Sequence, residues 1–413
     1  MKIRIMLFRE SAHRTELVST PMMAGAARMS RLRLVLAGAL ARYLQGAGHW
    51  ACFLQYILGL RDLGHDVLWL DVLVSTGTQA DDERLAQLLL KRFEQYRLRD
   101  VCALLVVDRK DEQDLRTARA YGVSKRRLAE FFRTADLLWN FAAGVRPPLL
   151  SLFRHRVLVD GDPGHLQISA QTWDLGLQHH QMFLTSGTKL GDADHGVPLL
   201  GLPWRPFVQF VYLPMWAPAP DPGVDAPFTS VTHWTWEELW QGDRVLSVSK
   251  RAAYLAYLDL PRVAGRPFEL AVNLHPRDRT GDRELLRGAG WRLVHPYRVA
   301  GTVSGYQRYL RRSRAEFGCP KPIHRELRTG WFSDRSACYL ASGRPVLIED
   351  TGLSDHLPTG EGLLVFRDMA EAVAGVEEID RNYARHQRAA RRLAEDLLDS
   401  RRCLTAMLAA CGH

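Results

Sequence analysis

Short apolar runs alternate with amphipathic stretches along most of the chain, which is the pattern of an α/β protein. Leu34–Gly38 reads as a buried strand, and a glycine-containing turn leads from it into a predicted helix over residues 49–63. Gly64 suits the end of that helix, and a second apolar run, Val67–Leu70, follows it. A strand, a helix and a strand in this order predict two parallel strands of one sheet.

The same alternation predicts two successive α/β series, separated by a proline-dense segment between residues 203 and 222. In the first series we expect helices near 82–96 and 124–133 and strands near 103–107, 137–141, 156–160 and 179–185. In the second series we expect strands near 228–233, 269–272 and 291–294 and a helix near 305–312. An apolar stripe predicts one long amphipathic helix from 380 to 410, formed by Leu393, Leu397, Leu404 and Leu408.

These patterns divide the chain into four predicted parts. Residues 1–28 are rich in Arg, Ser and Met without the apolar region of a signal peptide, so we expect a disordered tail or a mis-called start. Residues 29–215 and 216–380 are expected to form two Rossmann-like domains. Residues 381–413 are expected to form the C-terminal amphipathic helix.

The segment from Gly330 to Gly362 carries the clearest functional pattern. A glycine-opened loop leads into a predicted helix that ends at Gly343, and a buried strand follows over Pro345–Ile348. The acidic loop 349–352 comes at the carboxyl end of that strand, where open α/β sheets bind their ligands. Amides at a helix N-terminus, Ser and Arg side chains and an acidic loop together suit a diphosphate with a sugar attached.

Composition narrows the class of protein. A chain of 413 residues with 46% hydrophobic and 24% charged residues is typical of a two-domain globular enzyme. The formal charge of +9 is carried mainly by arginine, which indicates a solvated surface or attraction of an anionic substrate or a membrane surface. No basic stripe alternates with aromatic residues, so we expect no nucleic-acid partner.

Cysteine usage and hydropathy favour a cytoplasmic protein. Six cysteines are scattered without a CxxC pair, which predicts neither a disulfide framework nor a zinc site. Residues 34–60 are apolar on average but are interrupted by polar side chains and glycines, so we expect no integral membrane segment.

Several motifs together resemble the glycosyltransferases of the GT-B fold, in particular an uncharacterised bacterial set labelled glycosyltransferase family 1-like. The resemblance extends over most of the chain from about Ser30, and its motifs are specific in combination. They are Gly48-His49-Trp50, Leu63-Gly64-His65-Asp66-Val67, Asp160-Gly161-Asp162-Pro163-Gly164, Thr185-Ser186-Gly187, Gly330-Trp331-Phe332-Ser333-Asp334-Arg335-Ser336 and Tyr339-Leu340-Ala341-Ser342-Gly343-Arg344-Pro345-Val346.

The resemblance implies an α/β protein of GT-B fold, with two Rossmann-like domains facing a central cleft. It implies a nucleotide sugar bound on the C-terminal domain, an acceptor and a base on the N-terminal domain, and no bound metal or further cofactor. In one respect the chain departs from the family pattern. Where retaining members carry two glutamates around the donor helix, this chain has Cys338 and, near the earlier position, Gly330; Asp334 is the candidate substitute.

Transfer of a sugar requires positive charge or N–H donors for the departing diphosphate and contacts that orient the sugar. We predict that Arg335 acts on the diphosphate with Lys321 and the amides near Gly330 and Ser333. Carboxylates of the 349–352 loop suit the hydroxyl groups of the donor sugar, although Asp-Thr-Gly is also good turn chemistry. The predicted donor-binding residues are Lys321, Gly330, Ser333, Asp334, Arg335, Glu349, Asp350, Thr351 and Gly352.

The acceptor side is predicted around the first helix and around residues 160–162. His49 opens the helix and is a candidate general base, with packing or capping as its structural alternative. Gly48 would allow close approach of a ligand. Asp160 and Asp162 are predicted to orient the acceptor or the base, with a turn at Pro163-Gly164 as the alternative. By itself Asp160-Gly161-Asp162 also matches the metal motif of the GT-A fold, but the two-domain pattern argues against that interpretation.

The cluster Trp234, Trp236 and Trp240 could stack on a ring of a ligand or belong to the core. The sequence as a whole predicts a hexosyltransferase that moves a sugar from a nucleoside diphosphate sugar to a hydroxyl or amine of a small-molecule acceptor. Two alternatives remain, a nucleotide-sugar epimerase of the same fold and a non-catalytic sugar- or nucleotide-binding protein on the same scaffold.

Overall fold

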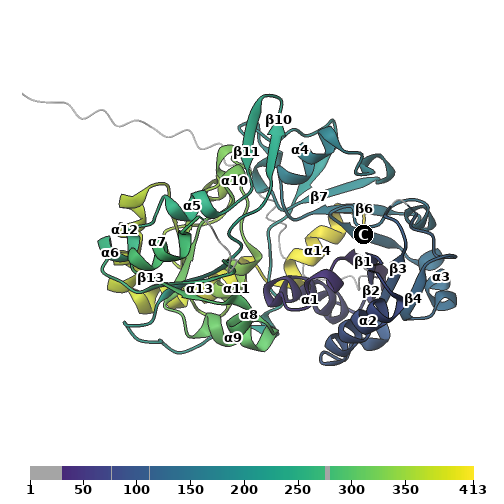
Figure 1. Cartoon of the computed structure of the whole chain (residues 1–413), viewed down its shortest axis with the longest axis horizontal. Coiled ribbons are helices and arrows are strands. Elements are labelled where there is room, and N and C mark those ends of the chain that lie inside the picture. The colour runs from purple at the N-terminus through teal and green to yellow at the C-terminus, as the bar shows by residue number, and fades with distance from the viewer. Residues whose placement is uncertain (1–29, 76, 111, 275–279) are drawn as a thin grey trace, which may run out of the picture. The chain divides into compact units, whose positions relative to one another are not determined.

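In the computed structural model, the first half of the chain forms one mostly parallel sheet (Figure 1). The structure describes residues 30–75, 77–110, 112–274 and 280–413, so the predicted tail at 1–28 lies outside the described residues. The described strands of this sheet are β1 (Arg33–Gly38), β2 (Asp66–Val74), β3 (Cys102–Val107), β4 (Arg119–Gly122), β5 (Leu137–Phe141), β6 (Arg156–Asp160), β7 (Met182–Thr185) and β8 (Trp204–Pro206).

The strand order of the first sheet is β4-β3-β2-β1-β5-β6-β7-β8, and β4 alone among these strands pairs antiparallel. The pattern did not predict β4 or β8, and β7 begins at Met182, later than expected, because residues 177–179 form a 3₁₀ turn. The helices of this half are α1 (Ala47–Asp62), α2 (Gln79–Glu94), α3 (Lys125–Thr134) and α4 (His165–Thr172). Short 3₁₀ helices lie at η1 (Ala41–Tyr43), η2 (Arg99–Val101), η3 (Leu149–Leu152), η4 (Leu177–His179), η5 (Thr188–Gly191) and η6 (Leu213–Met215).

The second half forms a parallel sheet with the order β13-β12-β9-β14-β15-β16. Its described strands are β9 (Phe228–Thr232), β12 (Phe268–Val272), β13 (Trp291–Val294), β14 (Ala315–Gly318), β15 (Val346–Glu349) and β16 (Leu363–Phe366). The helices are α5 (Arg251–Leu255), α6 (Leu260–Val263), α7 (Asp282–Gly288), α8 (Pro296–Ala300), α9 (Val303–Arg311), α10 (Pro322–Glu326), α11 (Asp334–Ala341), α12 (Met369–Arg381), α13 (Tyr383–Leu397) and α14 (Ser400–Ala410), with a 3₁₀ turn η7 (Leu353–Asp355).

Both faces of each sheet are buried. In β1, Leu34 packs into one apolar core and its neighbour Val35 into another, because successive side chains of a strand point to opposite faces. In β15, Val346 and Leu347 likewise belong to different cores. This two-sided burial explains why the parallel strands read as continuous apolar runs rather than as alternating patterns.

A hairpin, β10 (Glu238–Gln241) and β11 (Arg244–Ser247), is inserted directly after β9 and was not predicted. It contacts α4, beside the first sheet, and α10, beside the second (Figure 1). Leu239 and Leu246 of the hairpin share one apolar cluster with Phe183 of β7 and Ile323 of α10. The hairpin therefore joins elements of both sheets.

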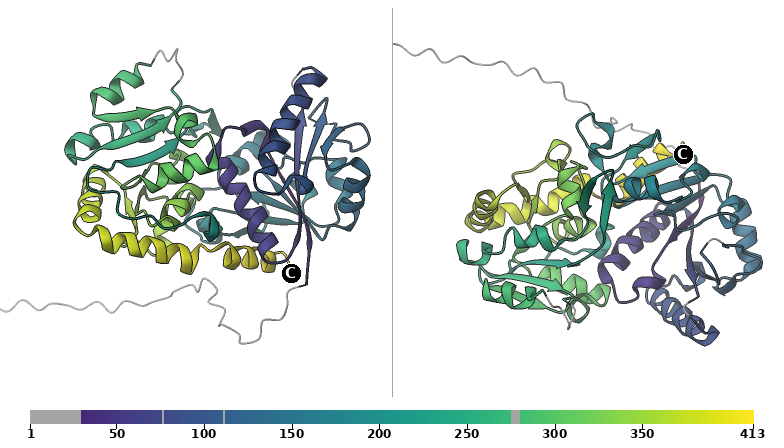
Figure 2. Two further views of the ribbon diagram at one scale, coloured as in Figure 1. Left: turned by 90° about the horizontal axis from the view of Figure 1, so that it is seen from below. Right: turned by 45° about the horizontal axis from the view of Figure 1, so that its top comes forward.

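The C-terminal segment does not form the single long helix that its apolar stripe predicted. It forms α13, which packs on α11, and α14, which packs on α1 beside the first sheet (Figure 2). At the break, Val211 N donates to the Leu398 carbonyl and Ser400 N donates to the Val211 carbonyl, both at 2.8 Å. The Asp399 side chain then caps α14 by accepting from Arg401 N. Pairing with Val211 thus replaces helical hydrogen bonds at the point where the chain crosses between sheets.

All six cysteines are free. No helix in the described residues is long and apolar enough to cross a membrane.

Candidate active site

The central strands of the two sheets place their carboxyl ends near one another. In each sheet the strand order reverses direction beside the first strand, between β1 and β5 and between β9 and β14, and such switch points are where α/β sheets bind ligands. His49 follows β1 in the first turn of α1, and His233 follows β9. The two imidazoles are close enough for each other's charge to matter, since His233 contributes to lowering the pKa of His49.

Three cations gather at the carboxyl end of β9 and β14: Lys250, Lys321 and Arg335, called here the cationic cluster. Lys250 directly precedes α5 and is 7% exposed. Burial, together with the positive charges of Arg335 and Lys321, lowers the pKa of Lys250 to about 7. Its ammonium lies 5.8 Å from the centre of the Trp331 ring.

The positive charges of the three side chains differ in whether a carboxylate neutralises them. Arg335 Nε lies 2.5 Å from Glu316 Oε1, and Lys321 is paired with Asp162. For Lys250, no carboxylate partner occurs among the residues that the structure describes. Lys250 is therefore the buried cation of the cluster whose charge is left for a ligand to neutralise.

Arg335 lies at the start of α11, as the sequence predicted for this loop and helix. Ser333 caps the helix by accepting from Arg335 N, and Arg335 Nη1 donates to the Val231 carbonyl at 3.1 Å. Burial alone would lower the pKa of Arg335, but the fully buried Glu316 raises it above the ordinary value. Arg335 is thus a fixed, permanently charged group that is tied to β9 and β14.

Asp162 connects the first sheet to the cationic cluster. Its carboxylate pairs with Lys321, and its Oδ1 lies 3.2 Å from His324 Nε2. Burial by itself would raise the pKa of Asp162, but Lys321 and His324 hold it well below its usual range. Asp162 is therefore an anion that positions Lys321.

Asp160 has a different environment from Asp162. Its carboxylate accepts from Gln167 Nε2, Thr185 Oγ1 and Asp162 N, each at 2.9 Å. Burial raises the pKa of Asp160 to about 6 in spite of these bonds. The side chain orders the loop that presents Asp162. Among the described residues, no group of three or more His, Cys, Asp or Glu side chains could hold a metal ion.

His49 has one ring nitrogen without a partner. The ring packs against Tyr43 and Phe53, at centroid distances of 4.6 and 4.9 Å, and hydrogen-bonds the Ala39 backbone. Its Nε2 is buried and unpaired within the described residues. Burial lowers the pKa of His49 to about 4, so the ring is neutral at pH 7. Gly48 beside it faces Tyr306 of α9, whose ring a Cβ would meet at 3.9 Å.

The structure brings the predicted sugar-binding loop 349–352 against the loop that contains Gly330. Gly330 N donates to the Thr351 carbonyl at 2.9 Å, and the Thr351 hydroxyl donates to the Trp331 carbonyl at 2.8 Å. Both carboxylates of this loop already have protein partners. Glu349 pairs with Arg325, and Asp350 accepts from Gly352 N, Ser354 and Arg367.

Gly330 has a structural task at the contact between the two sheets. Its φ is +67°, and a Cβ there would lie 2.3 Å from Thr188 Oγ1 and 2.7 Å from Lys189 N. The Thr188 hydroxyl donates to the Gly330 carbonyl at 2.8 Å. The glycine therefore allows the segment after β7 to pack directly on the second-sheet loop.

Asp334, the second residue of the capped turn, lies toward α1. Burial raises the pKa of its carboxyl group. Its charge acts on Cys52 and Tyr56 of α1, so the start of α11 faces the helix that carries His49.

Two features of this region were missed by the sequence pattern. Lys250 lies in no recognisable motif, because the inserted hairpin separates it from β9. Lys189, which follows β7, is 4% exposed and lies 2.9 Å from Asp192, 2.5 Å from Asp194 and 2.8 Å from Asp355. We call Lys189 with these three carboxylates the Lys189 network. It joins the first-sheet segment after β7 to η7 of the second sheet.

The three tryptophans of the predicted aromatic cluster have separate environments. Trp234 is buried, and its Nε1 donates to Asp282 at 2.7 Å. Trp236, in the segment that precedes β10, is 47% exposed, and Trp240, on β10 of the hairpin, is 61% exposed. The Trp236 ring lies 5.4 Å from His233, so one exposed indole borders the cationic cluster.

A cavity of about 550 Å³ opens beside the turn that leads into α1. Gln45 and Arg92 line it from the first sheet's side, and residues of α8, α9 and their flanking turns line it from the second.

No family model and no curated protein matches the chain. Solved structures do match over nearly its whole length. An alpha-glucosyltransferase in complex with UDP and a 13-mer DNA is 10% identical, covers 93% of this chain and 100% of its own, and has a TM-score of 0.58. Anabaena HepE in complex with UDP and glucose is 11% identical with a TM-score of 0.53, covering 92% of this chain and 100% of its own.

Sucrose-phosphate synthase from Thermosynechococcus elongatus is 10% identical with a TM-score of 0.50, covering 91% of this chain and 97% of its own. Together with the strand order of the two sheets, these similarities confirm the predicted α/β fold of the GT-B type. At such low identity they establish the fold and leave the chemistry to be argued from the residues of this chain.

Proposed function

We propose that this protein is a glycosyltransferase that moves a sugar from a nucleoside diphosphate sugar to a hydroxyl or amine of a small-molecule acceptor. The observation that carries the proposal is Lys250, a buried ammonium without a carboxylate partner in the described residues, flanked by Arg335 and Lys321. A group with two or more negative charges relieves this repulsion, and a diphosphate supplies them.

In this proposal the cationic cluster stabilises the leaving group. When the bond between the anomeric carbon and the phosphate oxygen breaks, negative charge grows on the departing diphosphate. Fixed cations in a site shielded from water stabilise that charge more strongly than they stabilise the intact donor. Lys250 contacts the diphosphate, while Arg335 and the first amides of α11 hold the adjacent oxygens.

His49 accepts the proton of the acceptor in the same proposal. Its unpaired Nε2 is a lone pair beside the cationic cluster, on the side of the first sheet. The acceptor oxygen bonds to the anomeric carbon as the diphosphate leaves, and its proton passes to Nε2. The pKa of His49, which burial lowers to about 4, leaves the imidazole neutral at pH 7, so the lone pair of Nε2 is free to take that proton.

The fold relatives indicate which nucleotide to test first. Two of them were solved with UDP, one of these also with glucose, and the proposed donor of this chain is accordingly a UDP-sugar. The relative solved with DNA makes nucleic acid an acceptor to be tested beside small molecules.

Lys250→Met tests the proposal more cleanly than Arg335→Ala, because loss of Arg335 would leave the buried Glu316 without its partner. We expect UDP to bind the wild-type protein in titration calorimetry and Lys250→Met to weaken binding by about 10- to 100-fold. Lys91→Met, an exposed lysine of α2, is the matched control and should bind UDP as the wild type does.

Product analysis then decides the reaction. Transfer of the sugar to an acceptor supports the proposal, and an epimerised donor without acceptor would favour an isomerase. Donor binding without turnover against a broad acceptor panel would favour a binding protein. Undiminished UDP binding by Lys250→Met would overturn the assignment of the diphosphate site.

A further inference from the structure

The 550 Å³ cavity beside the α1 N-terminus is lined by three arginines. Arg92 comes from α2, Arg298 from α8 and Arg308 from α9. Among the described residues, no carboxylate lines the cavity. The size is within the range of cavities that bind small molecules.

The arginines of the cavity are available to a ligand to different degrees. Arg92 is held in place, since its Nη2 donates to the Gly301 carbonyl at 2.8 Å and its guanidinium lies 5.4 Å from the Trp50 ring. The exposed side chains of Arg298 and Arg308 have no hydrogen-bond or ion-pair partner among the described residues. Both guanidinium groups are therefore available to an anion that enters the cavity.

The cavity is separate from the cationic cluster but next to it. Gln45 of its wall lies four residues before His49, on the turn that leads into α1. On the opposite wall, Gly305 and Arg308 flank Tyr306, which faces Gly48. The start of α1 is thus near the cavity through Gln45 and near the cationic cluster through His49.

We propose that this cavity is a second anion site, which binds a phosphate group of the acceptor. The planar guanidinium groups of Arg298 on α8 and Arg308 on α9, which line the same cavity, suit the oxygens of a phosphate monoester. Tyr297 and Gln45 also line the cavity and offer contacts to the neutral part of a sugar phosphate. Assigning the bound phosphate to the acceptor rests on the proposed function. The binding of an anion in this cavity does not depend on catalysis.

The test uses the full-length protein with glucose 6-phosphate as the probe and glucose as its neutral counterpart. We expect glucose 6-phosphate to bind protein that is already saturated with UDP, and glucose not to bind at the same millimolar concentration. Arg298→Gln with Arg308→Gln should weaken binding of glucose 6-phosphate by about tenfold or more. Arg292→Gln with Arg311→Gln removes the same charge from exposed positions outside the cavity and should leave binding within about twofold.

The outcomes separate this inference from the proposed function. If UDP does not bind but glucose 6-phosphate binds and the Arg298/Arg308 variant loses it, the anion site stands while the proposed donor site fails. If UDP displaces glucose 6-phosphate and the Arg298/Arg308 variant loses both ligands equally, the cavity belongs to the donor and the inference is wrong. It is also wrong if wild-type protein does not bind glucose 6-phosphate, or if both double variants lose it equally.

Discussion

At the scale of single residues, the cations of the candidate site differ in whether a carboxylate of the protein pairs with them. Arg335 and Lys321 were both predicted as ligands of the diphosphate, and the structure brings both to the carboxyl end of the second sheet, each already paired with an acid. Lys250 lacks such a partner among the described residues and carries the lowered pKa. Which cation is left for a ligand is a property of tertiary pairing, and no local sequence motif encodes it.

Lys250 makes nucleotide binding dependent on pH in a defined direction. Its pKa of about 7 in the free protein means that the ammonium is largely deprotonated at pH 8. A bound diphosphate favours the charged form and raises that pKa, so UDP should bind with uptake of a proton at pH 8. The affinity should be constant well below pH 7 on account of this group and should fall as the pH rises above 7. UDP itself is fully ionised in that range, since phosphate groups lose their second proton near pH 6.

Calorimetry at pH 8 in buffers of different ionisation enthalpy measures this proton uptake. Lys250→Met should abolish the uptake, and Lys91→Met should retain it. Proton uptake that persists in Lys250→Met would assign the titration to another group, such as His233, whose pKa burial lowers to about 4.

At the scale of elements, the sequence predicted the strands and helices that have strong apolar patterns. The expected strands of both series occur close to their predicted positions, because parallel strands buried on both faces leave long apolar runs. The hairpin β10–β11 was missed because each strand has only four residues and places an exposed apolar residue, Trp240 or Val245, directly beside a buried one, so no polar–apolar alternation is visible. The break at Leu398 was missed because its cause is Val211, a distant residue that supplies alternative hydrogen bonds.

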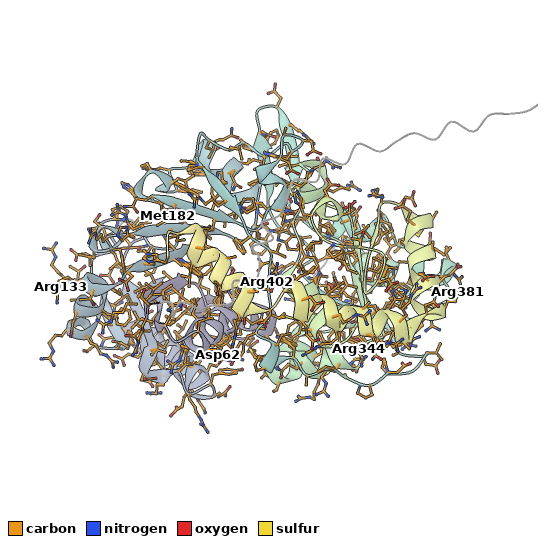
Figure 3. The ribbon with its side chains drawn as sticks, turned by 180° about the vertical axis from the view of Figure 1, so that it is seen from behind. Asp62, Arg133, Met182, Arg344, Arg381 and Arg402 are labelled. Carbon is orange, nitrogen blue, oxygen red and sulfur yellow. The ribbon has the colours of Figure 1, made fainter. Side chains whose placement is uncertain are left out.

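Arg344 shows how one buried side chain joins several elements of the second half (Figure 3). It is 1% exposed, and its guanidinium donates to the carbonyls of Arg311, Ala219 and Pro220 and to the Tyr383 hydroxyl. These contacts hold the end of α9, the segment that enters β9 and the start of α13. In the sequence Arg344 appeared only as one letter of a family motif.

Arg344→Met should lower the free energy of unfolding by about 3 kcal/mol or more, because several buried carbonyl groups lose their donor at once. Arg381, which Figure 3 shows at the far end of the molecule and whose side chain is 67% exposed, is the matched control. Arg381→Met should change stability by no more than about 0.5 kcal/mol. Denaturant unfolding of the two variants measures the difference, and equal stabilities would show that Arg344 does not hold these elements together.

At the scale of the whole described chain, the alternation of strands and helices predicted two Rossmann-like domains with parallel sheets, and the motif resemblance predicted the GT-B fold; the structure confirms both sheets. The contacts that join the two sheets could not be predicted from the sequence. Each of these contacts joins residues more than 140 positions apart in the sequence. They are Gly330 with Thr188, Lys321 with Asp162 and, in the Lys189 network, Lys189 with Asp355. Sequence periodicity predicts which face of an element is buried, but it does not predict which residues pack against that face.

The Lys189 network gives a prediction for the joint between the sheets. Replacing Lys189 by Met removes the cation that Asp192, Asp194 and Asp355 all contact. Arg328 then remains beside Asp194 and Asp355, and His356 beside Asp192, but neither contacts all three carboxylates. We expect Lys189→Met to lower the melting temperature by several degrees at pH 7, while Lys91→Met on the surface should leave it unchanged. The pH dependence separates this electrostatic effect from a packing defect.

The pKa of Lys189 is raised in the folded protein, chiefly by Asp194, Asp355 and Asp192 acting against the effect of burial. Its contribution to stability is therefore fully present below the ordinary lysine pKa and is lost only as the pH rises through the still higher folded value. The pKa values of Asp192 and Asp194 are lowered, so their contribution is present above the ordinary aspartate pKa and is lost as the pH falls through the folded values. The difference in melting temperature between wild type and Lys189→Met should accordingly stay constant from mildly acidic to mildly alkaline pH and shrink below about pH 4. A difference that persists undiminished at pH 3 would mean that Lys189 stabilises the joint through the packing of its aliphatic chain rather than through its charge.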